Sequence, residues 1–197
     1  KNVNLIPWKK ITKIVLNPKK YVNIAIIGKY VNLKDAYKSL DEALAHGGIS
    51  NKVKVNLIRI ESDKLKPSQI NKKLKNVSGL LIPGGFGKRG TEGKISAIKY
   101  ARKKKIPFLG ICFGMQMAII EFARNKLKIK KAGSSELDKN CFPVIGLINE
   151  WNKEGKIIKG TDKDLGGTMR LGLYEAKLRN NSAIKRIYKS NSIKERH

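Results

Sequence analysis

Cysteine and histidine are scarce in this sequence of 197 residues, which holds two of each. Cys112 and Cys141 cannot build a disulfide framework, and only His46 and His197 could join them in a four-ligand metal site. We therefore expect no structural metal. The lack of a disulfide framework is typical of a reducing compartment, so we expect a cytoplasmic location.

Long hydrophobic runs are also missing. No apolar stretch approaches the roughly 18 residues of a membrane-spanning helix, and the start of the chain, Lys1–Asn4, carries no apolar signal segment. We expect a soluble protein with no membrane partner. The length suits one domain with a buried core, because chains of this size bury roughly 70% of their extended surface. The first residue is not Met, which leads us to expect a part of a longer protein.

Acidic residues are few beside the basic ones, with 15 Asp+Glu against 43 Lys+Arg and a net charge of +28. Such a charge invites a nucleic-acid partner, because basic side chains neutralise phosphates. The lysines, however, are spread over nearly every segment, and no aromatic residues alternate with them as a base-stacking surface requires. We interpret the charge as a solvated surface and expect no nucleic acid. A basic α/β module that binds polyanions stays open as an alternative.

From Tyr21 onward, apolar runs typical of buried strands alternate with helical patterns. Strands are predicted at Val22–Ile27, Val53–Ile60, Val77–Ile82 and Ile106–Ile111. Helices are predicted from Leu33 to a terminal Gly47-Gly48, over Gln69–Leu74, from Glu92 to the run Lys103–Lys105, and over Phe113–Arg124 with Met115, Ile119 and Phe122 facing inward. The alternation predicts an α/β fold with a doubly wound, mostly parallel sheet and helices on both faces.

The two ends of the chain have different patterns. Residues 1–20 have no clear period, and we interpret them as a linker from a preceding domain. After residue 130, strand patterns follow one another before a last short helix. We therefore expect a β-rich C-terminal extension of a domain that spans residues 21–197. The strand patterns lie at Val144–Ile148, Lys156–Lys159 and Met169–Leu178, and the helix lies around Ser182–Tyr188.

The fourth predicted strand leads into Gly110-Ile111-Cys112-Phe113-Gly114 (the elbow), which has the spacing of a nucleophile elbow with Cys as the nucleophile. Glycines on either side permit a sharp turn that exposes the sulfur. The positive end of the following helix favours the thiolate, and the N–H of Phe113 is aimed where an oxyanion would form. The pattern alone leaves open whether Cys112 is a nucleophile or a small buried residue.

The third predicted strand leads into Pro83 and then Gly84–Gly90 (the glycine loop), which can lie beside the elbow in a parallel sheet. Its sequence formally matches G-x-G-x-x-G, but a dinucleotide site needs an acidic residue about 20 positions later. The next strand ends instead in the elbow. The phosphate-loop pattern G-x-x-x-x-G-K-[ST] does not match either, because Lys88 stands where the first glycine is required and Ile95 stands where Ser or Thr is required. We therefore expect Gly84 and Gly85 to bring a second backbone N–H to the same oxyanion.

Five segments together resemble the class I glutamine amidotransferase domain of the CTP synthase family. The resemblance covers Val22 to His197, and it makes residues 1–20 similar to the linker from a synthetase domain and residues 21–197 similar to the amidotransferase domain. The Gly-x-Cys-x-Gly-x-Gln pattern is typical of all class I amidotransferases. The Gly84–Gly90 loop and the Thr168–Gly172 segment are the motifs that specify the CTP synthase family. The segments are Gly28–Val31, Asp35–Ser39, Pro83–Gly90, Gly110–Gln116 and Gly167–Gly172.

The resemblance implies that a Cys nucleophile hydrolyses glutamine and that the ammonia aminates ATP-activated UTP in a synthetase domain. It implies no cofactor in this domain, ATP, Mg²⁺ and UTP in the synthetase domain, GTP as an allosteric activator, and a homotetramer. By motif, it assigns Cys112 as the catalytic residue, Gly84 and Phe113 to the oxyanion hole, Gly85, Phe113, Gly114, Met115, Gln116 and Glu136 to glutamine, and Phe86 and Arg170 to GTP activation.

The sequence departs from the family pattern at its C-terminal end. The family takes its catalytic base from a His-x-Glu pair beyond the Glu195-Arg196-His197 motif where this chain stops. Neither His46 nor His197 matches that base. We therefore expect an incomplete domain that hydrolyses glutamine weakly when it is alone. A class I glutaminase that serves another ammonia acceptor stays open as a second alternative.

Overall fold

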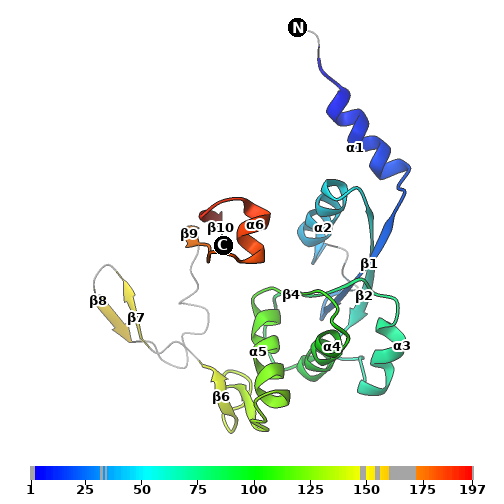
Figure 1. The fold of residues 1–197 in the computed structure, drawn as a ribbon. Helices are drawn as coiled ribbons and strands as arrows, with labels where there is room; N and C mark the ends of the chain where they lie inside the picture. Colours follow the sequence, from blue (N-terminus) through cyan, green and yellow to red (C-terminus); the bar gives the residue numbers. More distant parts are fainter. Residues whose placement is uncertain are drawn as a thin grey trace. The chain divides into compact units, whose positions relative to one another are not determined.

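The computed structural model describes residues 3–31, 33, 35–146, 150–153, 156–159 and 172–196. Two compact units divide the chain, residues 1–146 and residues 147–197. The elements of the first unit follow one another as drawn in Figure 1: α1 (Ile6–Leu16), β1 (Tyr21–Gly28), α2 (Lys38–Ser50), β2 (Lys54–Glu61), η1 (Pro67–Gln69), α3 (Ile70–Leu74), β3 (Gly79–Ile82), α4 (Thr91–Lys104), β4 (Phe108–Gly110), α5 (Phe113–Asn125), β5 (Ala132–Ser134) and β6 (Phe142–Ile145).

A four-stranded parallel sheet in the order β2-β1-β3-β4 forms the centre of the first unit. The order reverses direction between β1 and β3, and right-handed crossovers therefore place α2 on one face and α3 and α4 on the other. This arrangement confirms the predicted α/β fold with a doubly wound parallel sheet. Ile82 at the end of β3 pairs with Gly110 at the end of β4, so the two strands finish side by side.

The hydrophobic core lies on both faces of the two central strands. Ala25, Ile26 and Ile27 of β1 are fully buried, and every residue of β3 is buried. A strand that is covered on both faces has a nearly continuous apolar sequence, and this is why β1 and β3 could be predicted well from the sequence. Helix α4 adds Ile95 and Ile98 to the core, and α5 packs against α4.

Helix α2 differs from its prediction at both ends. It begins at Lys38, five residues after Leu33, and it runs through Gly47 and Gly48 to Ser50. Gly48 serves packing rather than helix termination, because an added Cβ would lie 2.8 Å from the Val53 carbonyl oxygen. The prediction that Gly47-Gly48 ends this helix was therefore wrong.

The predicted inward face of α5 is also wrong. Met115, Ile119 and Phe122 are 53%, 41% and 46% exposed. The buried face is shifted by two residues, because the turn before the helix sets its rotation and directs the Phe113 side chain into the core. The apolar residues on that buried face are Phe113, Met117, Ile120 and Ala123.

Residues 6–16 form a helix, α1, although the sequence showed no clear period there. Pro7 lies in its first turn, where a missing N–H costs nothing. The helix buries none of its residues, and Leu5, Trp8 and Leu16 are exposed. The interpretation of residues 1–20 as a linker stays a prediction.

The described residues of the second unit form short antiparallel strands and one helix (Figure 1). Helix α6 is capped at its start by Ser182, whose Oγ accepts a hydrogen bond of 3.1 Å from the Lys185 N–H. The predicted β-rich region is present, but two of its described strands, Glu150–Lys153 and Ser192–Arg196, were not predicted. The predicted strands Val144–Ile148 and Met169–Leu178 lie partly outside the described residues. The elements are β7 (Glu150–Lys153), β8 (Lys156–Lys159), β9 (Leu173–Lys177), α6 (Ala183–Tyr188) and β10 (Ser192–Arg196), with β7 paired to β8 and β9 paired to β10. Among the described residues of both units, no helix is long and apolar enough to cross a membrane.

A buried ion pair joins α4 to α5. The guanidinium of Arg102 donates two hydrogen bonds to Glu121, 2.9 Å from Nε to Oε2 and 2.7 Å from Nη2 to Oε1. The Glu121 side chain is 1% exposed, so its carboxylate has almost no contact with water. Such a carboxylate is stable only while its partner is present.

We predict that Arg102→Met lowers the free energy of unfolding by about 3 kcal/mol, because it leaves the Glu121 charge buried and unpaired. Urea unfolding of the 197-residue chain measures the change. Lys103→Met is the matched control, because Lys103 is exposed on the same helix and its loss is expected to change stability by under about 0.5 kcal/mol. Equal midpoints for the two variants would contradict the prediction.

Candidate functional site

Cys112 lies in the turn between β4 and α5, with φ 51° and ψ −106°. Such a backbone is strained for a residue with a side chain, and it persists only where the surroundings fix it. The Ile111 N–H donates to the Ile82 carbonyl over 2.9 Å, and the Gly114 N–H donates to the Ile111 carbonyl over 2.9 Å. These bonds fix the turn on either side of the sulfur, and Cys112 is exposed.

The two glycines of the elbow are required by close backbone contacts. A Cβ on Gly114 would lie 2.1 Å from the Ile82 carbonyl oxygen, and one on Gly110 would lie 2.6 Å from the Gly114 carbonyl carbon. Real Cβ atoms essentially never approach so closely. The strand can therefore turn into the helix only when both positions lack a side chain.

The first turn of α5 supplies polar backbone groups at the elbow. Phe113 is the first helical residue, and the N–H groups of a first turn have no acceptor within the helix. Its side chain is 2% exposed and anchors the turn in the core. The arrangement presents a thiol at the positive end of a helix beside the backbone N–H of Phe113, which suits a nucleophile whose reaction builds negative charge.

The glycine loop runs alongside the elbow. A Cβ on Gly84 would lie 3.6 Å from the Cys112 Cβ, which is ordinary van der Waals contact. Gly84 and Gly85 are partly exposed, whereas Phe86 is 66% exposed. The paired ends of β3 and β4 place these two loops together, as the parallel sheet led us to expect.

Two buried lysines lie behind the elbow. The Nζ of Lys29, the residue after β1, donates hydrogen bonds to the carbonyl oxygens of Phe86 and Gly87, the second over 2.8 Å. The Nζ of Lys29 lies 5.7 Å from the centre of the Phe113 ring, and that of Lys94 lies 4.7 Å from it. The sequence analysis did not predict a place in the site for either lysine. The position of Lys29 directly after a central buried strand could have indicated that it is buried, but not which groups it contacts.

Burial and like charges shift these two ammonium groups. Burial, followed by the charges of Lys29 and Arg89, lowers the pKa of Lys94 to about 8 against the opposing effect of Asp63. Burial, followed by Arg89, also lowers the pKa of Lys29, while Asp63 and Glu136 raise it. The candidate site therefore lies beside a cluster of interacting charges.

The remaining predicted residues divide into three groups. Glu136, in the segment after β5, is exposed and close enough to Lys29 to affect its pKa, so it belongs to the same region as the glycine loop. Gln116 is half-buried in the first turns of α5, and Met115 is exposed there. Arg170 and His197 lie outside the described residues.

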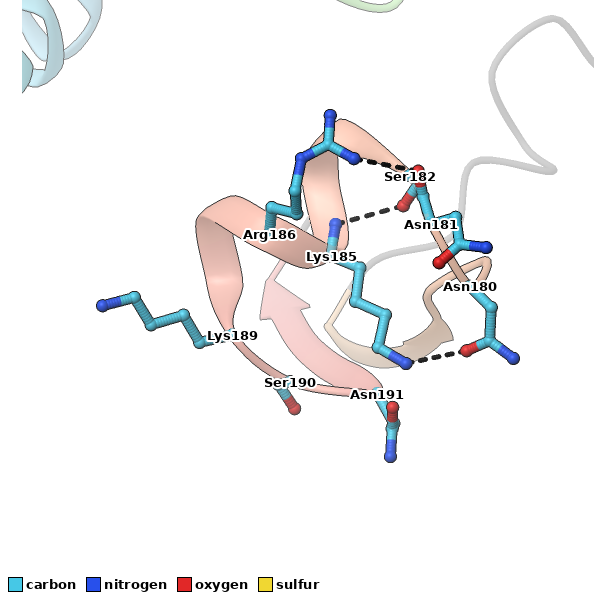
Figure 2. Close-up of a pocket in the computed structure, with 8 residues that line it drawn as sticks. All are labelled: Asn180, Asn181, Ser182, Lys185, Arg186, Lys189, Ser190 and Asn191. Atoms are coloured by element: carbon cyan, nitrogen blue, oxygen red, sulfur yellow. Dashed lines mark hydrogen bonds between the residues drawn. The ribbon is translucent and has the colours of Figure 1, made fainter.

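A pocket of about 610 Å³ lies in the second unit, and Figure 2 shows its lining. Its wall is basic and polar, and the Lys185 Nζ donates to the Asn180 Oδ1 over 2.7 Å. None of the residues predicted to act in chemistry lines it. The lining is Asn180, Asn181, Ser182, Lys185, Arg186, Lys189, Ser190 and Asn191. Within the described ranges, no three His, Cys, Asp or Glu side chains gather as a metal site.

Comparison with known proteins gives consistent matches. The sequence matches the glutamine amidotransferase class-I family over residues 32–197. It is 77% identical over 197 residues to the CTP synthase of Pelagibacter ubique and 50% identical over 198 residues to that of Zymomonas mobilis. These alignments cover 100% and 99% of the chain but only 37% and 36% of the relatives, so the chain spans about a third of their length.

A solved structure is also similar. It is the glutaminase domain of Trypanosoma brucei CTPS with bound acivicin, with a TM-score of 0.75 and 33% sequence identity. The match covers 89% of this chain and 66% of that one. The similarity therefore extends over most of the described elements.

We predict that Gly114→Ala lowers the free energy of unfolding by about 1–3 kcal/mol, because the new methyl group meets the rigid Ile82 carbonyl. The matched control is Gly47→Ala, because no heavy atom lies within 4 Å of a Cβ at that helical position. Alanine there is expected to raise stability by up to about 1 kcal/mol. Thermal and urea unfolding measure both, and equal effects would contradict the packing argument.

We predict a pH-dependent stability difference between the wild type and Lys94→Met. The pKa of Lys94 is about 8 in the folded protein, against an ordinary value of 10.5, so folding penalises its charged form. The penalty is complete below pH 8 and is lost as the pH rises to 10.5. The wild type should therefore gain about 3 kcal/mol relative to the variant between pH 7 and pH 10.5.

Urea unfolding at several pH values measures this difference. Lys103→Met controls for removal of an exposed lysine from the same helix, and its difference from the wild type should stay constant with pH. A constant difference for Lys94→Met over the same range would show that the folded protein does not disfavour the charged form.

Proposed function

The chain belongs to the class-I glutamine amidotransferase family, as a glutaminase domain of the CTP synthase type, and we propose that it releases ammonia from glutamine. The family predicted from the sequence is confirmed. The observation that carries the proposed reaction is the exposed thiol of Cys112, held in a strained turn at the start of α5 with the glycine loop nearby.

The reaction begins at the sulfur of Cys112. Its thiolate adds to the side-chain amide carbon of glutamine, and the electron pair of the carbonyl bond moves onto the oxygen. When the carbonyl re-forms, the carbon–nitrogen bond breaks, and the nitrogen takes up a proton and leaves as ammonia. Water then adds to the thioester, glutamate leaves, and the thiol is restored. Glutamine and water thus give glutamate and ammonia.

Backbone N–H groups would stabilise the oxyanion of both addition steps. The N–H of Phe113 comes from the first turn of α5, and the glycine loop supplies a second donor at Gly84 or Gly85. Each such donor is worth about 2.7–4 kcal/mol of the barrier. The proximity of Gly84 to Cys112 supports this assignment, because a Cβ added at Gly84 would lie 3.6 Å from the Cys112 Cβ.

Substrate binding would use the residues around the elbow. The exposed carboxylate of Glu136 would bind the ammonium group of glutamine, and its position near Lys29 places it in the same region. Gly85, Phe113 and Gly114 offer backbone groups, and Met115 and Gln116 offer side chains on the first turns of α5.

In the natural full-length protein, the ammonia would pass to a synthetase domain that uses ATP and Mg²⁺ to activate UTP for amination to CTP. This proposal follows from the two CTP synthases, of which the chain matches about a third. GTP activation through Phe86 and Arg170, and assembly into a homotetramer, belong to the same proposal. A reducing cytoplasm would suit the exposed Cys112 thiol.

We predict that Cys112→Ala in the natural full-length protein lowers glutamine-dependent CTP formation by at least about 10³-fold, because the nucleophile is lost. CTP formation from added ammonium chloride should be unchanged, because external ammonia bypasses the glutaminase step. Both rates are measured on the same preparation.

Cys141→Ala is the matched control and should keep both activities. Retention of glutamine-dependent turnover in Cys112→Ala would remove the thiol from the mechanism. If the wild type hydrolyses glutamine but makes no CTP from UTP and ATP, the domain serves another ammonia acceptor.

A further inference from the structure

Lys29 is a buried lysine at the carboxyl end of the central strand β1. Lys29 is only 7% exposed, and a lysine is almost never buried unless its ammonium group has partners. The partners of its ammonium group are two successive backbone carbonyls, those of Phe86 and Gly87. Its burial is therefore compensated by the glycine loop, 57 residues later in the chain.

The glycine loop depends on such contacts for its conformation. Gly87 and Gly90 have φ values of 75° and 74°, in the left-handed region, and the loop lies between β3 and α4 rather than within a regular element. A glycine-rich backbone loses much freedom when it is fixed. Because a peptide unit is planar, holding the Phe86 and Gly87 carbonyls toward Lys29 also fixes the N–H groups of Gly87 and Lys88, and it anchors the loop directly after Gly85.

The same ammonium group contacts the other half of the candidate site. It lies 5.7 Å from the ring of Phe113, whose backbone N–H is the proposed oxyanion donor of the elbow. A cation at this distance from an aromatic face is attracted to it. Lys29 therefore bridges the glycine loop and the elbow through one charged group.

We propose that Lys29 is a positioning residue for amide hydrolysis, which anchors the glycine loop at Phe86 and Gly87 and so restrains the adjoining Gly84 and Gly85, the proposed source of the second oxyanion donor. This inference rests on the proposed glutaminase function. Lys29 acts through the backbone and does not touch the reacting atoms. The alignment matters when negative charge develops on oxygen, so Lys29 should affect kcat and leave the binding of glutamine nearly unchanged.

The test uses glutamine hydrolysis by the natural full-length protein with Lys29→Met, which keeps the length of the side chain and removes its donors. We expect kcat to fall by about 10²–10³-fold, the effect of losing one oxyanion donor. KM should stay within about threefold of the wild type, because ground-state binding is not altered. Lys103→Met is the control, because Lys103 is an exposed lysine on α4.

Alkylation of Cys112 by iodoacetamide separates positioning from damage to the elbow. In that reaction the sulfur forms a bond to the methylene carbon and iodide leaves, so no oxyanion develops. We expect the alkylation rate of Cys112 in Lys29→Met, followed by mass spectrometry of its peptide, to match the wild type. Lys29→Gln, which keeps a donor without the charge, should give a kcat between the two, and it carries the test if the methionine variant does not fold.

An unchanged kcat in Lys29→Met, or a rise in KM alone, would overturn the proposal. A parallel loss of kcat and of iodoacetamide reactivity would also overturn it, because Lys29 would then only support the fold of the elbow. Failure of the proposed function looks different, because the wild-type protein itself would not hydrolyse glutamine.

Discussion

The close approach of three backbone segments around the Ile82 carbonyl is the constraint on which the site depends. This oxygen accepts the Ile111 N–H over 2.9 Å, and a Cβ on Gly114 would lie 2.1 Å from it. The end of β3, the elbow and the start of α5 therefore form one packed unit. Its hydrogen bonds and buried Phe113 side chain offset the strain of a positive φ at Cys112.

Charge has two distinct roles in this chain. Most of its 43 basic residues are spread over the sequence and explain the net charge of +28. Lys29 and Lys94 are different, because they are buried beside the Phe113 ring, and burial lowers the pKa of each. The total charge could not reveal this, because the effect depends on two positions.

Local pattern was enough to predict the four strands of the central sheet, its doubly wound arrangement and the elbow. It failed for the buried face of α5, because this helix carries two stripes of apolar residues with the same helical spacing. The turn at Cys112 decides that the stripe with Met117 is buried rather than the one with Met115. It also failed where partners are distant in the chain, because the bond from Lys29 to the Gly87 carbonyl leaves no local signal. Glu136 entered only through a resemblance, since a lone carboxylate has no pattern of its own.

Glycine shows most clearly what sequence can and cannot encode about such a site. The proposed oxyanion donors are backbone N–H groups, so the chemistry needs a backbone path rather than particular side chains. A sequence specifies that path chiefly by omitting a Cβ, as at Gly110 and Gly114. Gly47 looks the same in the sequence, yet a Cβ there would meet nothing within 4 Å. Only the contact atoms distinguish a glycine that builds the site from one that does not, and the spacing around Cys112 is informative because two required glycines flank one nucleophile.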